Sequence, residues 1–317
     1  MRYEELTIEG RNAVMEAFRS GKTIDKLFVL KNCQDGPVNS ILREARKHDT
    51  IVKFVPKERL DSMSETGAHQ GVIAQVAAYD YSTVEDILKK AEDKGEPPFI
   101  ILLDNIEDPH NLGAIIRTAN LAGAHGVIIP KHRAVGLTAT VAKTSAGALN
   151  YTPVAKVANL GQTIDELKEK GIHVCLDSNG GLWNEDVEEL FRLTDLVLLD
   201  IKEFNPNHHQ TLTGRSNEQT IRTAAWLEEQ EKPFWLRYVL VPGYSDFEED
   251  IRALGEALGK YKMIQRVEIL PYHTLGVHKY EAMGQEYKMK GVKENTPEQL
   301  EKAAEVFKEY FTTVVVN

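Results

Sequence analysis

The sequence predicts an α/β protein: a small N-terminal domain followed by a mostly parallel sheet. Short apolar runs such as 99–103 and 196–200 alternate with polar stretches that have helical spacing. Continuous apolar runs are typical of parallel strands that are covered on both faces. Asp104 and Asp200 stand where these two runs end. Because ligands bind at the carboxyl ends of parallel strands, we expect the candidate sites at that edge of the sheet.

Length and composition limit the class of protein. A chain of 317 residues is long enough for two or three domains with their own cores. No apolar run approaches eighteen residues, and residues 1–5 lack the apolar core of a signal peptide, so no membrane association is expected. The two cysteines, Cys33 and Cys175, are too few for a disulfide framework and indicate a reducing, cytoplasmic location.

The net charge of −10 is unevenly distributed along the chain. Residues 1–174 carry 22 Lys and Arg against 23 Asp and Glu, whereas residues 175–317 carry 16 against 25. The acidic second half therefore disfavours nucleic-acid binding led by phosphate attraction. A local basic patch would still allow the first half to bind nucleic acid.

Residues 1–78 are predicted to form the small α/β domain. The expected helices and strands are 11–18, 26–30, 38–48, 51–55 and 71–77. Arg43, Arg46 and Lys47 lie on the polar side of the second helix. They fit either an ordinary solvated helix face or a surface that contacts phosphates, and the sequence leaves both open.

Residues 79–82 are predicted to be a linker, followed by a helix at 84–94 and the buried strand 99–103. The next helix is expected to begin near Leu112, with Asn111 as its N-cap. We expect Gly113 to leave room for the backbone to approach a ligand. Arg117 lies four residues later on the same helix face, where it can either face a ligand or pair with Glu107 or Asp108.

The stretch 104–119, DNIEDPHNLGAIIRTA, resembles the first motif of the SpoU (TrmH-type) family of knotted RNA ribose 2′-O-methyltransferases. The similarity continues through 123–130, 134–138 and 141–148 to about Val174. Residues 8–14 and 69–72 resemble the ribosomal-protein-like RNA-binding domain of the 23S rRNA guanosine methyltransferases in that family. The resemblance implies ribosomal RNA as partner, Arg11 and Asn12 in RNA binding, Arg117 at the reacting ribose, and Asn111 shaping the same site.

The second and third motifs of that family are not found after Val174. In the family they form the S-adenosylmethionine pocket, the trefoil knot and most of the dimer interface. We therefore expect a protein that binds RNA, with no knot, without the family's dimer interface and with an incomplete pocket for methyl transfer.

The second half resembles another family, the pyruvate formate-lyase activating enzymes, which are radical S-adenosylmethionine proteins. The resemblance rests on the stretches 175–180, 196–202, 235–243, 270–276 and 282–284. It implies that Asp177, Asp200 and Lys202 lie near the cofactor or its bound monovalent cation, and that Arg237 and His273 line the same pocket. Asp200 and Lys202 fit a simple surface pair equally well.

The cysteine loop CxxxCxxC of this second family is absent, so we expect no [4Fe–4S] cluster, and the sequence assigns no metal site. Without the resemblance, this half still predicts a βα series, as in a partial barrel. The expected elements are strands 196–200, 234–241, 265–270 and 313–316 and helices 219–229, 247–258 and 297–310.

The two resemblances meet where a helix ends at Gly171 and a buried strand is expected at 172–176, with Asp177 at its end. The chain thus reads as a chimera that joins half of a SpoU-type domain, 83–174, to half of an activase-type barrel, 175–317. We expect one continuous sheet across this seam. Three functions stay open: a SpoU-type RNA-binding protein, a glycyl-radical-enzyme activase, and a chimera without enzymatic activity.

Overall fold

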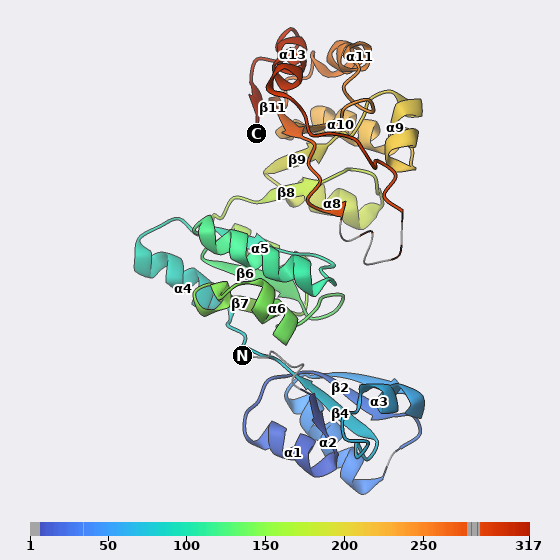
Figure 1. The fold of residues 1–317 in the computed structure, drawn as a ribbon. Coiled ribbons are helices and arrows are strands. Elements are labelled where there is room, and N and C mark those ends of the chain that lie inside the picture. Colours follow the sequence, from blue (N-terminus) through green and yellow to red (C-terminus); the bar gives the residue numbers. More distant parts are fainter. Residues whose placement is uncertain (1–6, 34, 278–279, 281–283, 285) are drawn as a thin grey trace. The chain divides into compact units, whose positions relative to one another are not determined.

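The structure is a computed structural model that describes residues 7–33, 35–277, 280, 284 and 286–317. Ala282 and Met283, which belong to one of the motifs quoted above, lie outside the described residues. The chain divides into two compact units, residues 1–163 and 164–317 (Figure 1). In the described part, no helix is both long and apolar enough to cross a bilayer.

The first domain of unit 1 is a four-stranded mixed sheet in the order β1-β4-β2-β3, in which only the β2–β3 pair is parallel. Helices α1 and α2 pack Val14 and Ile41 against Leu27 on one face, and α3 packs Leu60 against Phe28 on the other. The sequence missed β1 and α3. The elements are β1 (Thr7–Glu9), α1 (Arg11–Arg19), β2 (Ile24–Leu30), α2 (Gly36–Lys47), β3 (Ile51–Val55), α3 (Lys57–Met63) and β4 (Val72–Val76).

The second domain of unit 1 is a three-stranded parallel sheet in the order β5-β6-β7. Its core joins Val127 and Ile129 of β6 to Leu112 and Ile116 of α5. The elements are α4 (Val84–Lys94), β5 (Ile100–Leu102), α5 (Pro109–Leu121), β6 (Gly126–Pro130), α6 (Ala139–Thr144), η1 (Ala148–Asn150) and β7 (Val154–Val157), followed by α7 (Leu160–Glu169).

Residues 79–82, the predicted linker, are packed against both domains of unit 1. Tyr81 donates a hydrogen bond from its hydroxyl to Asp25 Oδ1 at 2.7 Å and accepts one from the Leu137 amide at 2.9 Å. Asp25 is buried and also pairs with Lys156 of β7. Through these contacts, Asp25 connects β2 of the first domain to the sheet of the second domain.

The start of α5 differs from the prediction. The helix begins at Pro109 and its N-cap is Asp108, whose carboxylate accepts from the His110 amide at 2.8 Å. Proline is favoured at the first helical position because it needs no partner for an amide hydrogen. Asn111 therefore lies in the first turn, and the prediction that it caps the helix is wrong.

Gly113 also has a different role from the predicted one. A Cβ added to Gly113 would overlap the hydroxyl of Thr144 and lie 2.8 Å from the Thr144 Cβ. The missing side chain thus lets α5 approach α6 closely. Gly113 serves helix packing rather than the approach of a ligand.

Unit 2 is a five-stranded sheet in the order β12-β11-β10-β9-β8, and all its strand pairs are parallel. The predicted strands and helices of this half are confirmed within a few residues, whereas α8 and α9 were missed. The elements are β8 (Cys175–Ser178), α8 (Glu185–Leu193), β9 (Leu196–Asp200), α9 (Pro206–Thr213), α10 (Glu218–Glu229), β10 (Phe234–Leu240), α11 (Glu248–Leu258), β11 (Ile264–Pro271), α13 (Pro297–Lys308) and β12 (Val314–Val316).

The predicted continuous sheet is wrong, because the described strands form separate sheets on the two sides of Gly171. β8 is an edge strand whose partner among the described strands is β9. It begins at Cys175 rather than Ile172, and its residues alternate between exposed and half-buried. An edge strand has a neighbour on one side only, which explains why the expectation of a fully buried strand failed. Asp177 accordingly lies within β8 and not after it.

Candidate functional site

Arg117 is exposed near the end of the third turn of α5. Its guanidinium makes no hydrogen bond or ion pair with any described residue, so the alternative pairing with Glu107 or Asp108 is not formed. Asn111 is half-buried in the first turn of the same helix. At 1.5 Å rise per residue, the two lie about 9 Å apart along the helix axis.

Arg11 and Asn12 occupy the first turn of α1, but only Asn12 is exposed. Arg11 donates from Nη2 to Asp35 at 2.7 Å and from Nε to the Gln70 carbonyl at 3.0 Å. The Val38 amide and Arg11 together hold the pKa of the Asp35 carboxyl below its usual range. Arg11 therefore ties three segments of the first domain together.

A shallow hollow lies directly beside Arg11. Its volume is about 320 Å³, and it is lined by Arg11, Leu30, Cys33, Gln70 and Gly71. The Arg11 guanidinium also lies 3.6 Å from the Cys33 sulfur.

Four of the five residues predicted to bind the cofactor form one ionic cluster in unit 2. Arg237 donates to Asp177 and, at 2.8 Å, to Asp200, which also accepts from Lys202 at 2.7 Å. We call these four residues the Asp200 cluster. Burial alone would lower the pKa of Arg237, but its two carboxylate partners raise it above the usual value. The cluster holds two cations and two anions, so it is balanced in charge.

His273 does not join the Asp200 cluster. It is exposed, two residues beyond the end of β11, and it forms no hydrogen bond or ion pair with the described residues of the cluster. Within the cluster each carboxylate already pairs with a cation. Binding the carboxylate and sulfonium of S-adenosylmethionine here would require these ion pairs to open, which disfavours tight binding of the cofactor.

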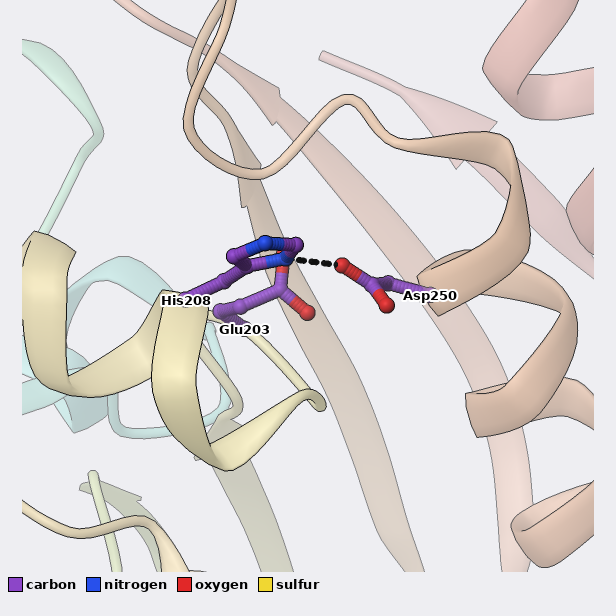
Figure 2. A group of neighbouring side chains, drawn as sticks. All are labelled: Glu203, His208 and Asp250. Carbon is purple, nitrogen blue, oxygen red and sulfur yellow. Dashed lines mark hydrogen bonds and ion pairs between the residues drawn. The ribbon is translucent and has the colours of Figure 1, made fainter.

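The structure brings together a second group that the sequence did not indicate: Glu203, His208 and Asp250, here called the Glu203 cluster (Figure 2). One ligand atom from each lies within 4.8 Å of the others. Glu203 follows β9, His208 lies in the first turn of α9, and Asp250 lies in the first turn of α11. In the sequence, only the short spacing between Glu203 and His208 hints at a group of metal ligands. Asp250 is too distant in sequence to be recognised as the third member.

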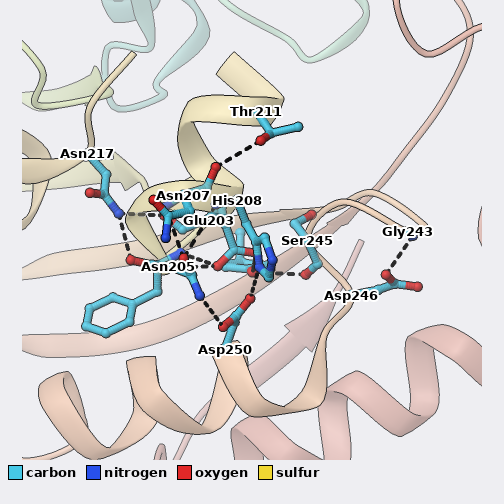
Figure 3. A network of polar contacts seen from close by, with 12 residues as sticks. Glu203, Asn205, Asn207, His208, Thr211, Asn217, Gly243, Ser245, Asp246 and Asp250 are labelled. Atoms are coloured by element: carbon cyan, nitrogen blue, oxygen red, sulfur yellow. Dashed lines mark hydrogen bonds and ion pairs between the residues drawn. The ribbon is translucent and has the colours of Figure 1, made fainter. Parts of the chain in front are cut away.

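The Glu203 cluster is surrounded by polar groups of the same unit (Figure 3). Asn205 donates its side-chain amide to Asp250 at 3.1 Å, and His208 Nδ1 lies 2.5 Å from the other Asp250 oxygen. The backbone amides of Phe204 and Asn205 donate to Glu203 Oε1. Burial raises the pKa of Glu203, and the hydrogen bond with Asp250 raises the pKa of His208.

Residues 7–82 match the family model described as RNA 2′-O ribose methyltransferase substrate binding, and residues 98–222 match that of the SpoU rRNA Methylase family. The second match runs past Val174, where the sequence led us to expect the resemblance to end. The chain belongs to the SpoU/TrmH family of RNA methyltransferases.

Two curated relatives give the extent of the match. The chain is 51% identical over 165 residues to the "Putative TrmH family tRNA/rRNA methyltransferase YacO" of Bacillus subtilis, covering 52% of this chain and 66% of that protein. It is 46% identical over 172 residues to a protein of the same family from Staphylococcus haemolyticus, covering 54% and 69%. The chain thus spans about two thirds of the length of these relatives.

Among solved structures, the chain is similar to a domain of pyruvate-formate lyase-activating enzyme from Bacteroides vulgatus. The identity is 20% and the TM-score 0.41, covering 49% of this chain and 88% of that one.

Proposed function

We propose that this chain binds ribosomal RNA through residues 7–82 and α5, with Arg117 facing a ribose, and that it does not complete methyl transfer. The observation that carries the proposal is the free, exposed guanidinium of Arg117. A guanidinium without an internal partner can donate to a phosphate or to a ribose oxygen without breaking a bond. Beside a ribose hydroxyl it would favour the deprotonated form.

The same proposal gives Asn12 and Arg11 different roles. Asn12 is exposed and free to contact RNA, whereas Arg11 would contact it only with the part of its guanidinium not directed at Asp35 and Gln70. The part of the site expected to be missing is the S-adenosylmethionine pocket, together with the knot and the dimer interface. This chain would therefore act as an RNA binder without the family's dimer interface.

A second candidate is weak cofactor binding at the Asp200 cluster. Its four charged side chains converge near the carboxyl ends of β8 and β9, beside the middle of β10, and ligands of parallel sheets bind at such strand ends. Because the charges already neutralise each other, we expect only weak binding of S-adenosylmethionine. Cys33 and Cys175 lie in separate units and would not hold an iron–sulfur cluster.

Calorimetric titration with a ribosomal RNA fragment and with S-adenosylmethionine, side by side, tests both proposals. We expect RNA binding that weakens steeply as salt increases, because phosphate contacts release counterions. We also expect no methyl transfer to ribose hydroxyls. Absence of RNA binding at low salt would overturn the first proposal, and tight cofactor binding that is lost in Asp200→Ala would instead favour the activase-like function.

A further inference from the structure

The Glu203 cluster has too little positive charge for the carboxylates it buries. Glu203 is fully buried and Asp250 is 5% exposed. No described Lys or Arg forms an ion pair with either of them, and His208 is the single basic group in contact. The Asp200 cluster, in the same unit, has two cations for two carboxylates. Buried carboxylates are normally paired or bound to a metal ion.

A count of hydrogen-bonding protons points to the same deficit. The buried hydroxyl of Tyr238 lies 3.0 Å from Glu203 Oε2 and 2.9 Å from the carbonyl oxygen of Ser245. A tyrosine hydroxyl has one proton, so it can serve only one of these two acceptors. When the Ser245 carbonyl takes it, Glu203 Oε2 has no donor from Tyr238. This oxygen is then able to accept a proton or a cation in place of the tyrosine hydrogen bond.

We propose that Glu203, His208 and Asp250 form a binding site for a divalent transition-metal ion such as Zn²⁺. One oxygen of Glu203, one oxygen of Asp250 and a ring nitrogen of His208 form a donor set that suits Zn²⁺ better than Mg²⁺ because it includes an imidazole. His208 is half-buried, so solvent reaches its side of the cluster and a water molecule can complete the coordination of the ion.

Binding requires a defined exchange of protons. His208 Nδ1 and Asp250 share a proton in the metal-free state, and when the ion binds Nδ1 this proton moves to Nε2 of a neutral ring or, from a charged ring, leaves for solvent. The distance between His208 Nδ1 and the Asp250 oxygen is that of a hydrogen bond. Rotation of His208 about its side-chain bonds lengthens this distance to that between two ligands of one ion. Asn205 keeps Asp250 oriented throughout, since its side chain donates to the Asp250 oxygen that His208 does not contact (Figure 3).

The test is Zn²⁺ binding to the full chain after chelator treatment, measured by competition with a chromophoric chelator. Cobalt absorption supplies a second readout of the coordination geometry. We expect one ion per chain in wild type and a loss of affinity of at least about tenfold in His208→Gln. The glutamine amide can still donate to Asp250, so this variant keeps the hydrogen bond while removing the imidazole ligand.

Two controls make the result decisive. His173→Gln changes an exposed histidine of the same unit outside the cluster, and Cys175→Ser removes the exposed thiol. Both should bind Zn²⁺ like wild type, and Zn²⁺ should raise the melting temperature of wild type but not of His208→Gln. Absence of binding in wild type, or equal binding in wild type and His208→Gln, would overturn the proposal and leave a purely structural hydrogen-bond network.

Discussion

Arg117 and Arg237 stand at predicted sites in the two units, but their surroundings are opposite. Arg117 is exposed on α5 without an internal partner, whereas Arg237 is largely buried and binds both Asp177 and Asp200. An arginine that already holds two carboxylates contributes chiefly to the structure around it. An exposed arginine without an ion pair stays hydrated, and it can bind a ligand without breaking an interaction within the protein. We therefore propose that RNA binding belongs to unit 1, whereas the Asp200 cluster contributes to the stability of unit 2.

The largest effect on stability should come from Arg237→Ala. The substitution leaves Asp200, only 16% exposed, with Lys202 as its remaining partner, and we expect unit 2 to lose about 3 kcal/mol in free energy of unfolding. All three tryptophans lie in unit 2, so tryptophan fluorescence during urea unfolding reports this unit alone. Arg237→Lys keeps the charge but cannot bind both carboxylates as the guanidinium does. Its free energy of unfolding should therefore lie between those of wild type and Arg237→Ala. A loss below about 0.5 kcal/mol would show that the Asp200 cluster contributes little to stability.

The Gly113→Ala variant tests how α5 is held. The added methyl group would collide with Thr144, and overpacking of this kind costs about 2 kcal/mol. We expect lower thermal stability of unit 1 by circular dichroism and weaker RNA binding, because α5 carries Arg117. Gly36→Ala is the matched control, since nothing lies within 4 Å of a Cβ at that helical position. Equal stability of the two variants would contradict the packing role of Gly113.

A smaller effect, dependent on pH, is expected where the two resemblances meet. Asp195 accepts from Lys168 at 2.7 Å and from the Val174 amide at 2.8 Å, on either side of Gly171. Burial alone would raise the pKa of Asp195, but these two hydrogen bonds hold it below its usual range. A lowered folded-state pKa stabilises the fold above the unfolded value near 4 and loses this contribution as pH falls further.

Asp195→Asn should therefore cost less than about 1 kcal/mol at neutral pH, because the pair is partly exposed. The difference between wild type and variant should shrink between pH 4 and lower values in fluorescence-detected unfolding. A difference that stays constant or grows as the pH falls would contradict this role of Asp195.

The sequence predicted local structure well and long-range assembly poorly. β3 and β9 coincide with their predicted ranges, because short apolar runs between polar segments are a strong local signal. The continuous sheet failed because strand pairing between distant segments leaves no such signal near Gly171. The N-cap of α5 failed because Pro109 moved the helix start to Asp108.

One of the two candidate sites in unit 2 could be predicted from the sequence, and the other could not. The Asp200 cluster could be predicted because parallel strands place their carboxyl ends together, and resemblance supplied the residues. His273 is not bonded to this cluster, because its segment leaves the end of β11 without a regular element to direct it, and its place in a cofactor pocket stays a prediction. The Glu203 cluster could not be predicted because it depends on how α9 and α11 approach each other, which no local pattern of residues encodes.

The most direct test of the central claim is the affinity of Arg117→Ala for ribosomal RNA, measured by fluorescence anisotropy at two salt concentrations. Arg222→Ala, an exposed helical arginine of unit 2, is the matched control. We expect Arg117→Ala to bind about tenfold more weakly, with a shallower salt dependence and an unchanged melting temperature, and Arg222→Ala to bind like wild type. Equal RNA affinity of wild type and Arg117→Ala would contradict the claim that this free arginine carries the interaction.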